Sequence, residues 1–171
     1  VTHTATVTKN VRHVAPGGRD AEDAGLTADD PYKTLNYAAS QAPGVCVILC
    51  AEGDYDEGEY VNGTERCRVY DYAKQLLFRG VGIGRSVLWG ALDETDPSDG
   101  RGPNAVRCAF FDSSVRSAIQ GFTVRDGRCV STGTESASTA RGGGGYNVNF
   151  VDCLITNCAA FRGQVVYHGS L

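Results

Sequence analysis

Beyond Tyr60 the chain consists of short apolar runs separated by Gly, Asn, Asp and Ser, and this punctuation most limits what it can fold into. Runs of this length between turn residues are typical of β-strands, and no convincing helical pattern competes with them. The predicted strands cover residues 67–70, 75–78, 86–89, 106–111, 118–124 and 146–156. We therefore expect this part of the chain to be all-β.

Two of these segments share a pattern. Gly121-Phe-Thr-Val-Arg-Asp-Gly127 aligns with Asp152-Cys-Leu-Ile-Thr-Asn-Cys158. Both have an apolar residue at the second and fourth positions, and Asp or Asn at the sixth, where a left-handed backbone would end the strand. Units that cannot bury an apolar face alone must stack on one another, so this repeat predicts a solenoid.

One helix is predicted before the strands. Asp29 or Asp30 would cap it, Pro31 suits its first turn, and apolar residues recur at helical spacing until Pro43 and Gly44. The helix should cover about residues 31–42. The apolar and β-branched residues that follow predict a buried strand over 45–50.

The seven cysteines could be disulfide-bonded or packed as small apolar side chains. Cys46 and Cys50 would lie roughly 13 Å apart along one strand, whereas a disulfide needs Cα atoms within about 7 Å. We favour packing for most of them. The side chains expected to point into the core are Leu77, Phe122, Val124, Cys153, Ile155 and Cys158.

Charge and hydropathy exclude two kinds of partner. The net charge is −4, and the Lys and Arg residues are scattered, so we expect no nucleic-acid partner. The longest apolar run, residues 45–51, is far shorter than the roughly 20 residues that span a bilayer. We therefore expect no direct membrane insertion.

Several stretches resemble the right-handed parallel β-helix proteins of the bacterial pectate-lyase-like superfamily. The opening residues that carry this resemblance are His13-Val-Ala-Pro-Gly-Gly-Arg-Asp20, Asp30-Pro-Tyr-Lys-Thr-Leu35 and Val47-Ile-Leu-Cys-Ala-Glu-Gly-Asp-Tyr55. Phe78-Arg-Gly-Val-Gly82 and Gly142-Gly-Gly-Gly-Tyr146 are similar to later coils of the superfamily. The second of these is also similar to surface and autotransporter-type adhesin repeats.

The resemblance implies an all-β fold, a single-stranded right-handed parallel β-helix (solenoid) with one short N-terminal capping α-helix. Residues 1–12 would form a leading strand or linker, 13–60 the cap and 61–171 the coils. The last residues are similar to a coil that has just begun, so we expect further coils, or another copy of the chain, at the C-terminal end. The resemblance also implies a protein that is secreted or displayed on a bacterial surface.

The expected function is binding or structural, as part of a longer protein that holds a polysaccharide or cell-surface glycan. Stacked strands space their side chains about 4.8 Å apart, and aromatic rings on such a face can lie against sugar rings. The aromatic residues expected to do so are Tyr60, Tyr70, Tyr72 and Trp89. A second possibility is a structural repeat protein that assembles end to end.

The superfamily also contains enzymes, so the chain could instead be the N-terminal part of a polysaccharide lyase or glycoside hydrolase. A lyase needs carboxylates and a base near them. Arg116, Arg125 and Asp126 have the right chemistry, but every charged surface offers such residues.

One acidic turn has the spacing of a candidate Ca²⁺ site. Its carboxylates come from Asp54, Asp56, Glu57 and Glu59, and Ca²⁺ takes six to eight oxygen ligands. The alternative is a solvated turn with no cofactor, which we favour because Gly58 supplies no side-chain ligand.

Overall fold

The computed structural model describes residues 10–63, 65–112, 116–130, 140–160 and 165–170. One short helix, α1 (Leu35–Gln41), lies between the first two strands. The strands are β1 (Val11–Val14), β2 (Val45–Cys50), β3 (Gly53–Tyr55), β4 (Tyr60–Asn62), β5 (Glu65–Asp71), β6 (Gln75–Arg79), β7 (Ser86–Trp89), β8 (Arg107–Phe111), β9 (Ala118–Gln120), β10 (Thr123–Arg125), β11 (Gly145–Tyr146), β12 (Asn149–Val151), β13 (Leu154–Thr156) and β14 (Val166–Tyr167).

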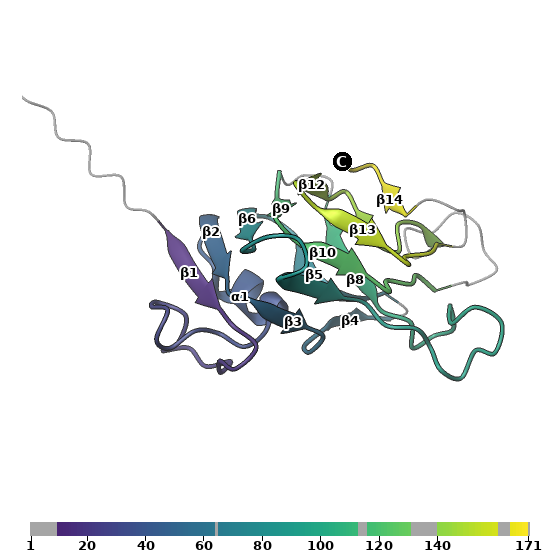
Figure 1. The fold of residues 1–171 in the computed structure, drawn as a ribbon, viewed down its shortest axis with the longest axis horizontal. Helices are drawn as coiled ribbons and strands as arrows, with labels where there is room; N and C mark the ends of the chain where they lie inside the picture. Colours follow the sequence, from purple (N-terminus) through teal and green to yellow (C-terminus); the bar gives the residue numbers. More distant parts are fainter. Residues whose placement is uncertain (1–9, 64, 113–115, 131–139, 161–164, 171) are drawn as a thin grey trace, which may run out of the picture.

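The strands form three sheets that share one core (Figure 1). The first sheet has the order β1-β2-β6-β9-β12, the second β13-β10-β7-β3 and the third β14-β11-β8-β5-β4. From β6 onward the chain visits the first, second and third sheets in turn. Neighbouring strands pair in parallel, except that β4 runs antiparallel to β5.

The predicted single-stranded right-handed parallel β-helix is wrong. The structure has three sheets, of which two are parallel and one is mixed. The mixed sheet arises because the chain turns back between Asn62 and Glu65, where Gly63 has a φ of 60°. Glycine accepts the positive φ that a tight hairpin turn requires, so β4 folds onto β5 instead of continuing to the next sheet.

Two segments that were each predicted as one strand are interrupted by residues with a positive φ. The segment 118–124 divides into β9 and β10 at Gly121, and the segment 146–156 divides at Asn147 and Asp152. These three residues have φ values of 71°, 53° and 51°, which a continuous strand cannot accommodate. Each therefore ends one strand and redirects the chain toward the next sheet.

The predicted internal repeat is confirmed. β10 pairs with β13 in the register that the alignment gives, with Val124 opposite Ile155. Asp126 and Asn157, at the sixth position of each segment, have φ values of 58° and 48°. Both tolerate the left-handed backbone that ends the strands.

Helix α1 begins later than predicted, because Thr34 is its cap instead of Asp29 or Asp30. The Thr34 hydroxyl accepts a hydrogen bond from the Tyr37 backbone N–H at 3.2 Å. The carboxylate of Asp20 accepts hydrogen bonds from that hydroxyl, at 2.7 Å, and from the backbone N–H groups of Lys33 and Thr34. Among the described residues, no helix is long and apolar enough to cross a membrane.

The core consists of columns of side chains that the parallel register stacks strand upon strand. Phe122 and Val124 are fully buried, as predicted, and Cys153, Ile155 and Cys158 pack against the core with partial exposure. Ile48, Phe78, Ile119 and Phe150 form one such column in the first sheet.

The prediction for Leu77 is wrong. Leu76 and Phe78 point into the core, and Leu77 faces outward together with Gln75 and Arg79. Residues two apart in a strand lie on the same face of the sheet. Leu77 is two residues from both Gln75 and Arg79, so it lies with them on the outer face.

Five of the cysteines, Cys46, Cys50, Cys67, Cys108 and Cys129, are buried. Cys46 and Cys50 lie on the core face of β2, and burial raises the pKa of the Cys50 thiol well above its ordinary value.

We expect Asn147→Val to unfold more readily than Asn147→Gly. Both variants lose the hydrogen bond from the Asn147 amide to the Phe111 carbonyl, but only valine is strained at a φ of 53°. The free energy of unfolding by urea should be lower for the valine variant by about 1–2 kcal/mol. Equal stabilities would contradict the conformational role assigned to this position.

Candidate functional site

A column of aromatic rings crosses the third sheet, with one ring from each of its five strands. Neighbouring ring centroids are 3.8 to 5.8 Å apart, and the first four rings stack with interplanar angles of 5° to 24°. In spatial order the rings belong to Tyr60, Tyr70, Phe110, Tyr146 and Tyr167. Parallel register explains most of the column, because Tyr70, Phe110, Tyr146 and Tyr167 are direct pairing partners.

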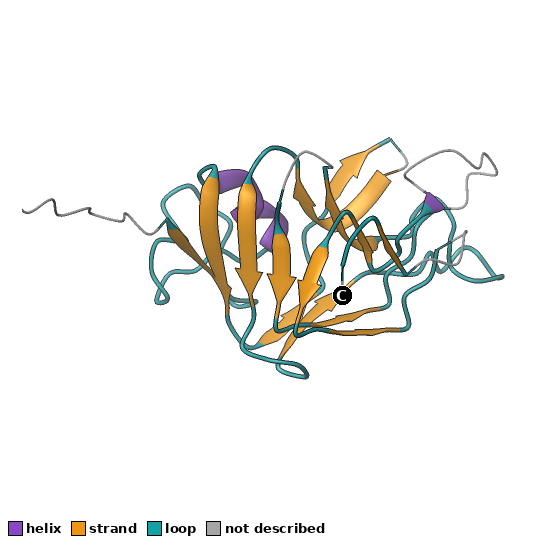
Figure 2. Ribbon diagram, turned by 90° about the horizontal axis from the view of Figure 1, so that it is seen from above, coloured by secondary structure: helices purple, strands orange, loops and turns teal. Residues whose placement is uncertain are grey.

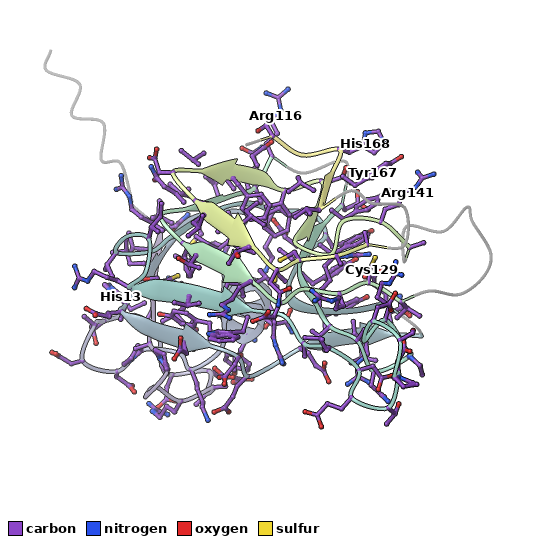
Figure 3. The ribbon with its side chains drawn as sticks, turned by 45° about the vertical axis from the view of Figure 1, so that its right-hand side comes forward. His13, Arg116, Cys129, Arg141, Tyr167 and His168 are labelled. Atoms are coloured by element: carbon purple, nitrogen blue, oxygen red, sulfur yellow. The ribbon has the colours of Figure 1, made fainter. Side chains whose placement is uncertain are left out.

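Stacking determines which rings a ligand can cover. Tyr70 has Tyr60 on one side at 3.8 Å and Phe110 on the other at 5.8 Å, so its two faces are occupied by neighbours. Only a ring at an end of the column can offer a face. Tyr167 is at one end, beside Arg141, whose guanidinium carbon lies 4.5 Å from the ring centroid (Figure 3).

At the other end, Tyr60 lines a hollow between α1 and the end of β5, which we call the tyrosine cleft. Its volume is about 230 Å³. The residues that line it are Asn36, Ala39, Ser40, Tyr60, Tyr70, Asp71, Tyr72, Ala73 and Lys74. Three of the four aromatic residues predicted to bind sugar therefore meet at one place. Tyr72 is 65% exposed, so it borders the opening of the cleft.

Hydrogen bonds also fix the part of the cleft lined by Lys74 and Asp71. The Lys74 ammonium donates to the carbonyl oxygens of Ala39 and Ser40, each at 2.7 Å, and so satisfies the last turn of α1. Burial lowers the pKa of Lys74, while the charge of Asp71 opposes that shift. Asp71 is 2% exposed and accepts from the Ser117 hydroxyl and from the Lys74 backbone N–H.

Asn36 brings an amide to the cleft. It lies in the first turn of α1, and its side chain forms no hydrogen bond with any described residue. An amide offers both donors and an acceptor, which is the pairing that a sugar hydroxyl needs. The cleft thus combines aromatic surface with an available amide.

Trp89 lies apart from the tyrosines, in the second sheet. Its indole N–H donates to Asp54 at 2.9 Å, and the Arg125 guanidinium carbon is 4.1 Å from the ring centroid. One face of Trp89 is therefore covered by Arg125, its pairing partner on β10. The indole and the guanidinium hold each other in place.

The three catalytic candidates are divided between two sheets. Arg125 Nε donates to Asp126 Oδ2 at 2.7 Å, and Asp126 also accepts from the Asn157 amide. Arg116 precedes β9 in the first sheet and projects outward (Figure 3). The structure brings Arg125 and Asp126 together in a hydrogen-bonded network but leaves Arg116 outside it.

The predicted Ca²⁺ ligands face other partners. Glu57 pairs with Lys33 at 2.5 Å and Glu59 with Arg66 at 2.6 Å, while Asp54 accepts from Trp89. Asp56 is exposed, on the same turn. Within the described part of the chain, no group of three or more His, Cys, Asp or Glu side chains is arranged to hold a metal ion.

Sequence reasoning missed Asn36, Ser40 and Lys74 as cleft residues, since nothing local relates α1 to a turn more than 30 positions later. It also missed Phe110, Tyr146 and Tyr167 as members of one column. The sequence does hold a signal for those three, because each is an aromatic residue near the end of its strand, and the three strands β8, β11 and β14 pair side by side. Only the pairing register shows that the three rings lie directly beside one another.

The titration of Tyr70 offers a test of the column. Burial, with a contribution from the Tyr60 hydroxyl, raises the pKa of Tyr70 from 10.0 to about 12. The folded state therefore holds this proton more tightly than the unfolded state, so stability is full below pH 10 and falls as the pH rises through about 12.

We expect Tyr70→Phe to lose less stability than the unmodified chain between pH 10 and 12, because it has no phenol to ionise there. Urea unfolding at a series of pH values measures the difference. An equal loss in both proteins would show that Tyr70 ionises alike in the folded and unfolded states.

No family model matches the chain, and no curated protein matches it either.

Proposed function

We propose that the protein binds a polysaccharide or cell-surface glycan, with one sugar unit held in the tyrosine cleft. The observation that carries this proposal is the meeting of Tyr60, Tyr70 and Tyr72 with the unpaired amide of Asn36. A sugar ring has apolar C–H faces and a rim of hydroxyl groups. Aromatic rings suit the faces, and amide or carbonyl groups suit the rim.

The rigidity of the cleft supports binding. Tyr60 is stacked on Tyr70 with an interplanar angle of 5°, so its plane is fixed before a ligand arrives. Lys74 connects the turn after β5 to α1 through two hydrogen bonds, which fixes a second part of the cleft lining. A preformed site loses little conformational entropy when it binds, which favours affinity.

The size of the cleft suits a small unit. Its volume of about 230 Å³ lies below the roughly 300–1,000 Å³ of sites that enclose drug-sized ligands. We therefore expect one residue of a glycan to enter the cleft, with the rest of the polymer lying outside it.

Affinity electrophoresis in gels that contain soluble neutral or acidic polysaccharides tests the proposal. We expect at least one polymer to retard the protein, and Tyr72→Ala to weaken that binding about tenfold through the loss of one aromatic contact. Tyr72 is 65% exposed, so its replacement should leave the fold intact.

Two matched controls locate the site. Tyr167→Ala removes the ring at the far end of the column, and Trp89→Phe removes the indole of the second sheet while keeping an aromatic ring. Neither should change retardation. The proposal fails if no polymer retards the protein, or if Tyr72→Ala binds as the unmodified chain does. New reducing ends or unsaturated uronate in the same mixtures would instead indicate an enzyme.

A further inference from the structure

The first sheet is apolar on both of its faces. Cys46, Ile48 and Cys50 of β2 point into the core, while Val45, Val47 and Leu49 point outward. Val45 is 64% exposed and Val151, at the far edge of the sheet, is 42% exposed. This sheet forms the upper surface in Figure 1 and faces the viewer in Figure 2, where α1 lies behind it.

Parallel sheets are usually covered on both sides, and their strands are then apolar throughout. The outer face here has that composition, but no described helix covers it. A hollow of about 670 Å³ lies on it, lined mainly by aliphatic side chains such as Val11, Val47, Leu77 and Ala118. The composition therefore indicates a surface that is buried in an assembly.

Two opposite charges lie at opposite ends of this face, and neither forms an ion pair with a described residue. Arg116 is exposed, two positions before Ala118 at the start of β9. Asp152 follows β12, and its carboxylate accepts a hydrogen bond from the Gln120 amide at 3.4 Å. Val151 pairs with Gln120, so Asp152 is about five positions beyond Arg116 along the strands, roughly 16 Å away.

We propose that the outer face of the first sheet is the interface of a two-fold symmetric dimer, in which Arg116 of each copy pairs with Asp152 of the other. The two-fold axis lies in the interface, across the strands and close to Ala118. That rotation reverses the strand direction, so the start of β9 in one copy meets the end of β12 in the other. Symmetry makes the two ion pairs equivalent.

The two Arg116–Asp152 pairs favour this arrangement over the other face-to-face dimer, although it also brings Arg79 beside Arg116 of the second copy. A two-fold axis parallel to the strands and centred on β6 would place Arg79 against Arg79 of the second copy. The proposed axis instead places Arg79 across from Gln75, at the opposite end of the same strand. Like charges in contact oppose association, and complementary charges fix the register.

The size of the face sets the expected strength. Five strands about 4.8 Å apart, three to six residues long, give a surface of roughly 20 by 14 Å. Two such faces bury less than the roughly 1,200 Å² of a stable complex, so we expect a weak dimer that forms only at high protein concentration.

Sedimentation velocity over micromolar to near-millimolar concentrations tests the proposal. We expect a reversible monomer–dimer equilibrium. Arg116→Asp or Asp152→Arg alone should weaken it about tenfold, and the double exchange should restore it. Asp152 has a φ of 51°, so Asp152→Asn, which tolerates that backbone, serves as a second variant that removes only the charge.

Three more variants check the face and the register. Val45→Glu places a charge in the apolar face and should abolish the dimer, whereas Leu26→Glu, at a loop position that is 62% exposed, should not. Arg79 pairs with Gln120, which places it beside the position that Arg116 of the second copy would occupy. Arg79→Gln removes the repulsion between these two arginines and should therefore tighten the dimer. A monomer at every concentration, or a double exchange that fails to restore association, would overturn the proposal.

Discussion

Parallel pairing in a fixed register is the constraint on which the rest of the structure depends. Each strand of a sheet lies directly beside the equivalent strand of the next passage of the chain, so residues at matching positions form columns. Inside the molecule, these columns are the hydrophobic core, as with Ile48, Phe78 and Ile119. Outside, the same rule produces the aromatic column of the third sheet and the aliphatic face of the first.

Residues with a left-handed backbone maintain that register. Asp126 and Asn157 end β10 and β13 at equivalent positions, and Asn147 and His168 do the same after β11 and β14. A turn of the same shape at each position lets the next strand begin where its neighbour began. The side chains of these residues also connect one passage with the next, since the Asn157 amide donates to Asp126.

The sequence allowed prediction of features that depend on neighbours in the chain. The strand over 45–50, the burial of Phe122 and Val124, and the register between the two repeated segments all follow from local patterns of apolar and turn residues. The predicted fold class was wrong, because the turn at Gly63 creates the β4–β5 hairpin and makes the third sheet mixed. A glycine in the sequence permits such a turn, but whether the flanking segments pair with each other depends on the other strands available to each of them in three dimensions.

The candidate site was only partly predictable. Tyr60, Tyr70 and Tyr72 were chosen for their chemistry, but their convergence depends on the hairpin that brings β4 beside β5. Tyr70 supports its neighbour instead of offering a face, which only the stacking distance of 3.8 Å reveals. The Asn36 amide belongs to α1, and the position of α1 depends on how the apolar side of the helix packs on the core.

The tyrosine cleft and the apolar face share no lining residue, yet they adjoin at the turn between β5 and β6. Lys74 lines the cleft and Gln75 lines the face. Association through the first sheet would leave the third sheet exposed and would join two clefts in one assembly. Two linked sites bind a repeating polymer more tightly than either does alone, because the second contact forms at a high effective concentration. A single sugar unit per cleft then suffices for useful affinity toward a polysaccharide, which reconciles the small volume of the cleft with a polymeric ligand.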